Sequence, residues 1–258
     1  MLPLKDFVAS IDRFVVAHRG ASGTAPENTL AAIRQSLAAK VQMIELDAHV
    51  TADNRAILLH DNVVGRTTGG HGRLSAMTFE QLRELDAGSW FHSDFSAERV
   101  PLLSEALDLL KNRAYLNIEI KPPLPDEDYQ SRFEIIFRTV NEAEMIPYTL
   151  FASFHHATLR EIKRRYPESH TAAINIPGDK RLPSEIAAEI ACEGIVYGLR
   201  EITYAKMSDA EKSGLYIGAY VINTEDDLHR AMRYGVRALA SDFPAKIMEL
   251  LRSCNLAR

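Results

Sequence analysis

Short apolar runs rich in β-branched residues recur along the chain and alternate with longer stretches of helical periodicity. This alternation is typical of βα units arranged around a parallel sheet, so the chain is predicted to be an α/β protein. The apolar runs predict strands at 14–18, 42–47, 56–60, 115–120, 149–153, 170–175, 194–197, 215–221 and 237–241. The helical patterns lie near 29–39, 104–112, 128–144, 156–165, 183–191, 204–213, 225–234 and 244–252.

One connection is too short for a parallel crossover. The strands 42–47 and 56–60 are separated by a segment that contains Asp53-Asn54, whereas a parallel crossover needs about a dozen residues or more. Asp and Asn tolerate the left-handed conformations of tight hairpins, so 56–60 is predicted to pair antiparallel with 42–47. Eight parallel strands then remain, which predicts a (β/α)8 TIM barrel with its active site at the C-terminal ends of the strands.

The chain length suits one such barrel. We expect residues 1–258 to form a single domain, because barrels of this class run to roughly 250 residues. The segment 62–101 has only a short helical pattern near 78–85. It is predicted to be a small insertion at the C-terminal face of the barrel, where a loop could shape access to the site.

Candidate chemistry appears at the end of the second strand. Glu45 and Asp47 are two residues apart, so on a strand both side chains point to one face. Two adjacent carboxylates repel unless a cation lies between them, and Glu119 could add a third carboxylate from another strand. Oxygen ligands of this kind suit Mg²⁺ or Ca²⁺. A turn centred on Asp53-Asn54 would place His60 opposite Asp47, at a Cβ separation of ~5 Å, and therefore over the metal.

Composition narrows the function. The formal net charge is −5 and the basic residues are dispersed, so the basic patch of a nucleic-acid binder is missing and an anionic ligand would need local positive charge. Hydrophobic residues make up 46% of the chain, but no stretch reaches transmembrane length and no apolar leader is visible. Cys192 and Cys254 are expected to be reduced thiols. We therefore expect a cytoplasmic protein without stable membrane association.

Short motifs with charged or polar residues follow one another from the first strand to the last. No single motif is decisive, but their order is. They are His18-Arg19-Gly20, Pro26-Glu27-Asn28-Thr29, Glu45-Leu46-Asp47, Thr51-Ala52-Asp53, His60-Asp61, Arg66-Thr67-Thr68, Pro101-Leu102-Leu103-Ser104-Glu105, Ile118-Glu119-Ile120-Lys121, Ser153-Phe154, Val221-Ile222-Asn223 and Ser241-Asp242-Phe243-Pro244.

This ordered set resembles the glycerophosphodiester phosphodiesterase family, of the cytoplasmic type. The resemblance implies a metal-dependent hydrolysis of glycerophosphodiesters to glycerol 3-phosphate and an alcohol, with the glycerol 2-hydroxyl as the first nucleophile. It implies Mg²⁺ or Ca²⁺ as cofactor, with Mn²⁺ as a further option, and a small-molecule substrate. The implied roles are metal binding by Glu45, Asp47 and Glu119, acid–base catalysis by His18 and His60, and phosphate binding by Arg19 and Lys121.

Two other functions stay open at this stage. One is a lysophospholipase D on the same fold, although the sequence shows no obvious amphipathic anchor for a membrane. The other is a phosphodiester-binding module without catalysis, against which the complete set of histidines and carboxylates argues. Tyr220 stands where family members commonly carry Trp, which leaves the preferred head group open, as it does the working metal, the order in which the histidines act and the oligomeric state.

Two neighbouring features have simpler structural interpretations. Asn28 is expected to cap the helix that follows it, with Thr29 as the alternative cap and a contact between Asn28 and the site left open. His49 lies outside the matched motifs and is expected to be structural.

Overall fold

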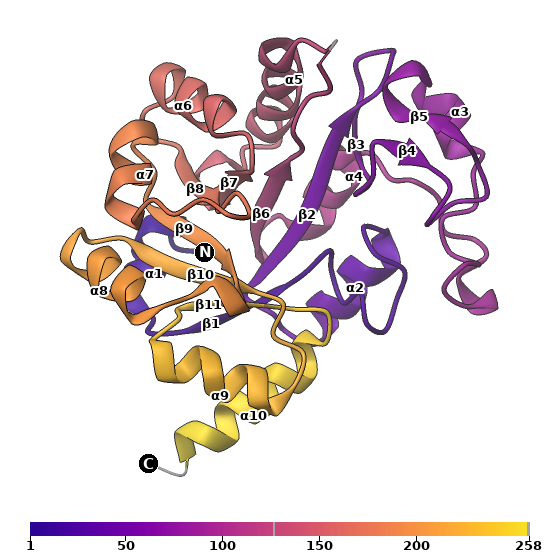
Figure 1. Cartoon of the computed structure of the whole chain (residues 1–258). Helices are drawn as coiled ribbons and strands as arrows, with labels where there is room; N and C mark the ends of the chain where they lie inside the picture. The colour runs from indigo at the N-terminus through magenta and orange to yellow at the C-terminus, as the bar shows by residue number, and fades with distance from the viewer. Residues whose placement is uncertain (126, 257–258) are drawn as a thin grey trace.

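Eight parallel strands close into a barrel in the computed structural model, which describes residues 1–125 and 127–256 (Figure 1). The first strand pairs with both the last and the second, which closes the sheet. The predicted (β/α)8 TIM barrel is therefore confirmed. Its strands are β1 (Phe14–Ala17), β2 (Met43–Val50), β6 (Tyr115–Ile120), β7 (Thr149–Ser153), β8 (His170–Ile174), β9 (Gly194–Gly198), β10 (Tyr216–Tyr220) and β11 (Ala238–Ser241).

Helices surround this barrel and bury its outer face (Figure 1). Each helical stretch expected from the sequence is present, with ends shifted by a few residues. None of the helices within the described residues is long and apolar enough to cross a membrane. The outer helices are α2 (Leu30–Ala38), α4 (Leu103–Leu110), α5 (Tyr129–Glu142), α6 (His156–Arg165), α7 (Pro183–Ile190), α8 (Tyr204–Lys212), α9 (Glu225–Tyr234) and α10 (Pro244–Leu256), with short 3-10 turns η3 (Ile146–Tyr148) and η4 (Leu199–Glu201).

The barrel interior is apolar at the N-terminal ends of its strands. Phe14, Met43, Tyr115 and Tyr216 belong to one buried cluster there. A helix that the sequence pattern did not predict, α1 (Leu4–Ser10), packs into this cluster through Leu4, which is 1% exposed. Cys192 is a buried free thiol elsewhere in the fold, and the side chain of Cys254 lies outside the described part of the chain.

The predicted hairpin is present, but its register differs from the prediction by one residue. β3 (Ala56–Leu58) pairs antiparallel with β2, and the Leu59 amide donates to the Asp47 carbonyl at 3.1 Å. Leu59 therefore lies opposite Asp47, whereas His60 was expected there. The turn is one residue longer than expected, because Thr51 pairs with Arg55 across three residues, and Asn54 takes the left-handed φ of 59°.

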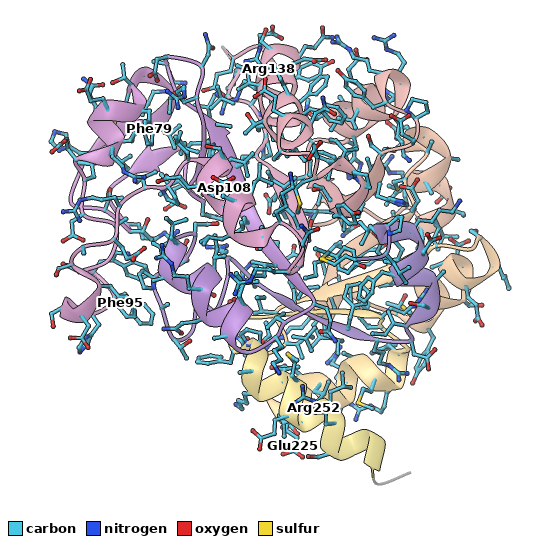
Figure 2. All side chains as sticks on the ribbon, turned by 180° about the vertical axis from the view of Figure 1, so that it is seen from behind. Phe79, Phe95, Asp108, Arg138, Glu225 and Arg252 are labelled. Carbon is cyan, nitrogen blue, oxygen red and sulfur yellow. The ribbon has the colours of Figure 1, made fainter. Side chains whose placement is uncertain are left out.

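The segment after the hairpin forms the predicted insertion. It contains β4 (Val63–Val64), β5 (Gly72–Arg73), η1 (Leu74–Ala76), α3 (Phe79–Arg83) and η2 (Ser93–Phe95). It has a small core of its own, which includes Val64, Leu74 and Leu82 and packs against Ile57 of β3. Figure 2 shows Phe79 and Phe95 of this insertion at one side of the molecule, away from the helices α9 and α10 that carry Glu225 and Arg252.

Candidate active site

A cavity of about 320 Å³ opens at the C-terminal ends of the barrel strands. His18, Arg19, Glu45, His60 and Glu119 line it. The two remaining predicted site residues contact this set: Lys121 through Glu119 and Asp47 through Arg19. The structure thus brings together all seven side chains that the sequence singled out.

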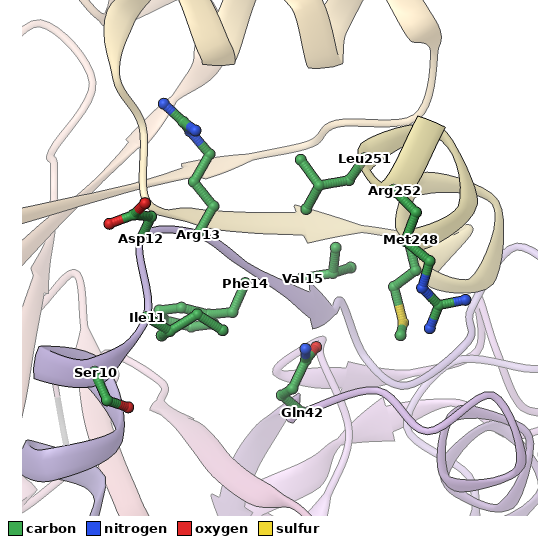
Figure 3. Close-up of a pocket in the computed structure, with 10 residues that line it drawn as sticks. All are labelled: Ser10, Ile11, Asp12, Arg13, Phe14, Val15, Gln42, Met248, Leu251 and Arg252. Atoms are coloured by element: carbon green, nitrogen blue, oxygen red, sulfur yellow. The ribbon is translucent and has the colours of Figure 1, made fainter. Parts of the chain in front are cut away.

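A larger hollow, of about 600 Å³, lies at the opposite end of the barrel (Figure 3). Its lining comes from the segment that leads into β1, from Gln42 before β2, and from α10. Asp12 is the one carboxylate among the residues drawn there, and the side chains of Arg13 and Arg252 point away from each other (Figure 3). The paired carboxylates and histidines belong to the smaller cavity.

Three carboxylates form the acidic centre of this cavity. Glu45 and Asp47 share one face of β2, and Asp47 lies beside Glu119 in the register between β2 and β6. One oxygen from each of the three lies within 4.8 Å of the others. Burial, and after it the negative charge of Asp47, raises the pKa of Glu45 to about 8. The proton that Glu45 keeps near neutral pH thus relieves both the burial of its charge and its repulsion from Asp47.

Two cations lie against these carboxylates. The Lys121 Nζ is 2.7 Å from Asp47 Oδ1 and 2.7 Å from Glu119 Oε1. The Arg19 Nε is 3.3 Å from Asp47 Oδ2, and the Arg19 amide donates to Glu45 Oε2 at 2.8 Å. Burial alone would raise the pKa of Asp47, but Lys121 and Arg19 outweigh it and hold that pKa well below its usual range.

The backbone around Arg19 has an unusual conformation that serves these contacts. Arg19 and Gly20 have φ values of 55° and 77°. A left-handed residue other than glycine costs on the order of 1 kcal/mol, so such a residue persists only where its surroundings hold it. Here the Arg19 amide donates to Glu45, and a Cβ on Gly20 would lie 2.7 Å from the Cβ of Ala32 on α2.

His18 is oriented by a carboxylate from the other end of the chain. Its Nδ1 lies 2.7 Å from Asp242 Oδ1, and Asp242 also accepts hydrogen bonds from Ser22 Oγ and Asn223 Nδ2. Burial lowers the pKa of His18, but the Asp242 hydrogen bond and the charge of Glu45 outweigh it and raise that pKa above the ordinary value. The sequence motifs contained Asp242 and Asn223 but did not reveal this role.

His60 has an equivalent partner in its neighbour. Its Nδ1 lies 2.7 Å from Asp61 Oδ1. The carbonyl of His60 lies 3.2 Å from Nε2 of the buried His49, and the other nitrogen of His49 faces Arg132. Burial lowers the pKa of His49 to about 4, so the ring is neutral and donates to that carbonyl. His49 is thus a structural residue, as expected, and it holds the backbone of His60.

The helix cap before α2 was assigned to the wrong residue. Thr29, not Asn28, caps the helix by accepting from the Ala32 amide. Asn28 has a φ of 58°, and its side chain donates to Asp47 Oδ2 at 2.7 Å and accepts from the Asp47 amide at 3.0 Å. An N-cap residue needs an extended backbone, which the left-handed Asn28 lacks. Asn28 therefore orients the central carboxylate of the cluster.

The far side of the cavity is apolar. Its residues come from β8 to β11 and from the segments that follow β7 and β10, and they include the aromatic rings of Phe154 and Tyr220. Asn117, one step below Glu119 on the same face of β6, also lines the cavity, and its buried Oδ1 has no hydrogen-bond partner among the described residues. The cavity thus joins a charged half to an apolar half.

Comparison with known proteins identifies relatives of this chain. The model of the glycerophosphoryl diester phosphodiesterase family matches residues 18–246. A glycerophosphodiester phosphodiesterase of Caldanaerobacter subterraneus is 29% identical over 239 residues, covering 92% of this chain and 97% of its own length.

Solved structures agree with the sequence comparison. The structure of an Oleispira antarctica phosphodiesterase in complex with the product sn-glycerol-3-phosphate superposes with a TM-score of 0.88 at 27% identity, and the match covers 95% of this chain and 99% of that one. A protein of Silicibacter pomeroyi described as a glycerophosphoryl diester phosphodiesterase gives a TM-score of 0.84 at 25% identity, with 94% of each chain covered.

Proposed function

The chain belongs to the glycerophosphoryl diester phosphodiesterase family, and on this premise we propose that it hydrolyses glycerophosphodiesters to glycerol 3-phosphate and an alcohol with the help of a divalent metal. The observation that carries the proposal is the meeting of three carboxylates, two cations and two carboxylate-bound histidines at one cavity. The product bound to the Oleispira antarctica relative is of the same chemical class.

The charges of the cluster fit a divalent cation. Once Glu45 has lost its proton, Glu45, Asp47 and Glu119 oppose Lys121 and Arg19, which leaves one net negative charge in a buried site. A divalent cation reverses that charge, and a phosphodiester anion then neutralises it. Oxygen ligands suit Mg²⁺ and Ca²⁺, with Mn²⁺ as a third candidate. Such a metal would polarise a phosphoryl oxygen and stabilise the charge that builds on it.

Arg19 and Lys121 are proposed to bind the phosphoryl oxygens. Lys121 has three N–H donors, and Asp47 and Glu119 engage two of them. The third donor is available to a phosphate oxygen. Arg19 Nη1 donates to Glu27, whereas Nε lies 3.3 Å from Asp47 Oδ2 without a hydrogen-bond partner among the described residues, which leaves N–H groups of its fork for the same anion.

His18 and His60 are proposed to divide the proton transfers. Each ring has Nδ1 against an aspartate, so Nε2 is the nitrogen available to the substrate. One ring accepts the proton of the glycerol 2-hydroxyl as its oxygen bonds to phosphorus. The bond from phosphorus to the alcohol oxygen breaks, and the other ring gives that oxygen a proton. Water then gives up a proton and bonds to phosphorus, the bond from phosphorus to the glycerol 2-oxygen breaks, and that oxygen takes a proton, which yields glycerol 3-phosphate.

A substrate panel tests the reaction. Metal-depleted protein is supplied with Mg²⁺, Ca²⁺ or Mn²⁺ and offered glycerophosphocholine, glycerophosphoethanolamine and a long-chain lysophosphatidylcholine, with both the alcohol and glycerol 3-phosphate measured. We expect metal-dependent release of both products from the glycerophosphodiesters. Faster cleavage of the lysolipid would favour a lysophospholipase D, and no turnover with any metal would favour a binding module.

Three substitutions in the site and one control outside it test the roles. His18→Ala and His60→Ala should each lower kcat by at least about 100-fold, whereas His92→Ala, at an exposed histidine on the insertion, should leave it unchanged. Glu119→Gln removes one anionic ligand and should raise the metal concentration needed for half-maximal activity by about tenfold or more. Near-normal kcat in either site-histidine variant would contradict the acid–base assignment.

We also propose that residues 1–258 act as one domain and that the protein works in the cytoplasm on a small-molecule substrate. The packing of the insertion against β3, the low cysteine content and the buried thiol of Cys192 support these proposals.

A further inference from the structure

Arg66, on the insertion between β4 and β5, joins two carboxylates. Its Nε donates to Asp61 Oδ2 at 2.7 Å, while Nη1 and Nη2 donate to the two oxygens of Glu27 at 2.9 and 2.7 Å. These contacts take three of the five N–H donors of the guanidinium. Arg66 therefore reaches the residues of the site through these two carboxylates.

Each of the two carboxylates has a second contact inside the site. Asp61 holds the Nδ1 of His60 at 2.7 Å through its other oxygen. Glu27 Oε1 accepts from Arg19 Nη1 at 2.9 Å. His60 follows the hairpin and Arg19 follows β1, so Arg66 connects side chains that no single element positions.

The burial of Glu27 makes the connection energetically significant. Its side chain is 12% exposed and lies between Arg19 and Arg66. Burial would raise the pKa of Glu27, but the hydrogen bonds of Arg66 and the charge of Arg19 outweigh it and lower that pKa. Removing one partner from a buried hydrogen-bonded carboxylate leaves charge uncompensated, so the remaining groups rearrange.

A second arginine of the insertion, Arg83, forms an ion pair away from the candidate site and so provides a comparison for Arg66. Arg83 on α3 makes a bidentate pair with Glu105 on α4, at 2.6 and 2.7 Å, and also donates to the Val100 carbonyl. Its side chain is 37% exposed, close to the 46% of Arg66. Its ion-pair and hydrogen-bond partners among the described residues, Glu105 and Val100, are not candidate site residues.

We propose that Arg66 is a positioning residue that fixes His60 through Asp61 and Arg19 through Glu27, so that one loop of the insertion sets the acid–base group and the phosphate-binding group in a single geometry. The inference rests on the proposed phosphodiester hydrolysis. It assigns the insertion a part in that reaction beyond covering the barrel.

Steady-state kinetics of matched variants test the two connections separately. Arg66→Met keeps the apolar stem and removes the fork, and it should lower kcat and raise KM, each by about tenfold. Asp61→Asn should reproduce most of the loss in kcat, and Glu27→Gln most of the rise in KM. Arg66→Lys should recover only part of either parameter, because an ammonium cannot bridge both carboxylates as a fork does.

Arg83→Met is the control for general loosening of the insertion. It should lower the melting temperature about as much as Arg66→Met does and leave kcat and KM unchanged. The proposal also predicts that Asp61→Asn adds little further loss of kcat in the Arg66→Met background, because both changes break one connection.

Three results would overturn the proposal: wild-type kcat and KM in Arg66→Met, full multiplication of the two losses in the double variant, or equal kinetic losses in Arg83→Met and Arg66→Met. If Arg66→Met does not fold, Arg66→Lys is compared with Arg83→Met, and wild-type parameters in Arg66→Lys count against the proposal. Absence of hydrolysis by the wild-type chain with every metal would instead refute the proposed function.

Discussion

Asp242 accepts hydrogen bonds from His18, Ser22 and Asn223, although 224 positions along the chain separate it from His18. It thereby occupies Nδ1 of His18 and leaves Nε2 as the nitrogen available to a substrate. Burial would raise the pKa of Asp242, but its hydrogen bond with His18 and the charge of that ring, followed by Asn223 and Ser22, lower it to about 2. Asp242 is therefore ionised wherever His18 titrates, and it favours the charged form of the ring.

Asp242→Asn tests this residue-scale contact. The amide keeps the shape of the side chain but loses its charge, so it can hold the wrong tautomer of His18, and kcat should fall by roughly 100-fold or more. Asp86→Asn is the matched control, because the pKa of Asp86 is likewise about 2, but the groups that lower it are the Ser89 side chain and the amides of Ser89 and Gly88, all on the insertion. Unchanged kcat in Asp242→Asn would mean that His18 does not depend on this partner.

The N-cap of α2 shows how two neighbouring residues can suit the same role equally well by residue type. Asn28 and Thr29 are both good helix caps, and local sequence favoured the first. The choice depends on the backbone: Thr29 is extended, whereas Asn28 is left-handed and turns its amide toward Asp47. Residue types therefore predicted the charged groups of the site, while their partners depend on chain geometry that local sequence does not encode.

At the scale of elements, periodicity predicted the barrel strands well because a strand buried on both faces has a clear apolar run. The hairpin register was wrong by one residue because register depends on turn length, and the two-residue and three-residue turns fit the same Asp-Asn sequence. His60 nevertheless lines the cavity. It lies beyond the end of β3, and its carbonyl contacts the ring of His49.

The helix α1 escaped prediction because seven residues give too short a pattern, yet it covers the apolar floor of the barrel. Leu4→Ala removes a side chain that is 1% exposed and should lower the free energy of unfolding by about 3 kcal/mol. Kinetics below the melting temperature should be unchanged, because the floor lies at the opposite end of the strands from the site.

The neighbouring Leu2 provides the control for that helix. Leu2 is 57% exposed, so Leu2→Ala should change the free energy of unfolding by at most about 0.5 kcal/mol. Denaturant unfolding of both variants measures the difference. Equal stabilities of the two would show that α1 does not contribute to the barrel core.

For the whole molecule, the overall charge was a poor guide to the site. A net charge of −5 indicated only that an anionic ligand would need local positive charge, and the fold gathers Arg19 and Lys121 around three carboxylates, with Arg66 and Glu27 beside them. Long-range convergence of this kind follows from the closed barrel, which brings strand ends from the whole chain to one face. The fold class was predictable; the distances in the site were not.

Because of this convergence, the protonation of Glu45 should affect both the stability of the protein and its affinity for a metal. In the metal-free chain burial and Asp47 raise the pKa of Glu45 from its ordinary 4.5 to about 8. A carboxyl whose pKa is raised on folding contributes stability at pH values below 4.5 that is lost as the pH rises through 8. The contribution of Glu45 should therefore give the metal-free protein a lower melting temperature at pH 8 than at pH 6.

A bound divalent metal must displace that proton, so its apparent affinity should tighten by up to about tenfold per pH unit between pH 6 and pH 8. At one fixed Mg²⁺ or Ca²⁺ concentration, the gain in melting temperature should be larger at pH 8 than at pH 6. In Glu45→Gln, which cannot titrate there, the gain should be smaller and nearly independent of pH, whereas Glu105→Gln on α4 should behave like the wild type. An equal gain at both pH values in the wild-type chain would show that the metal does not bind through Glu45.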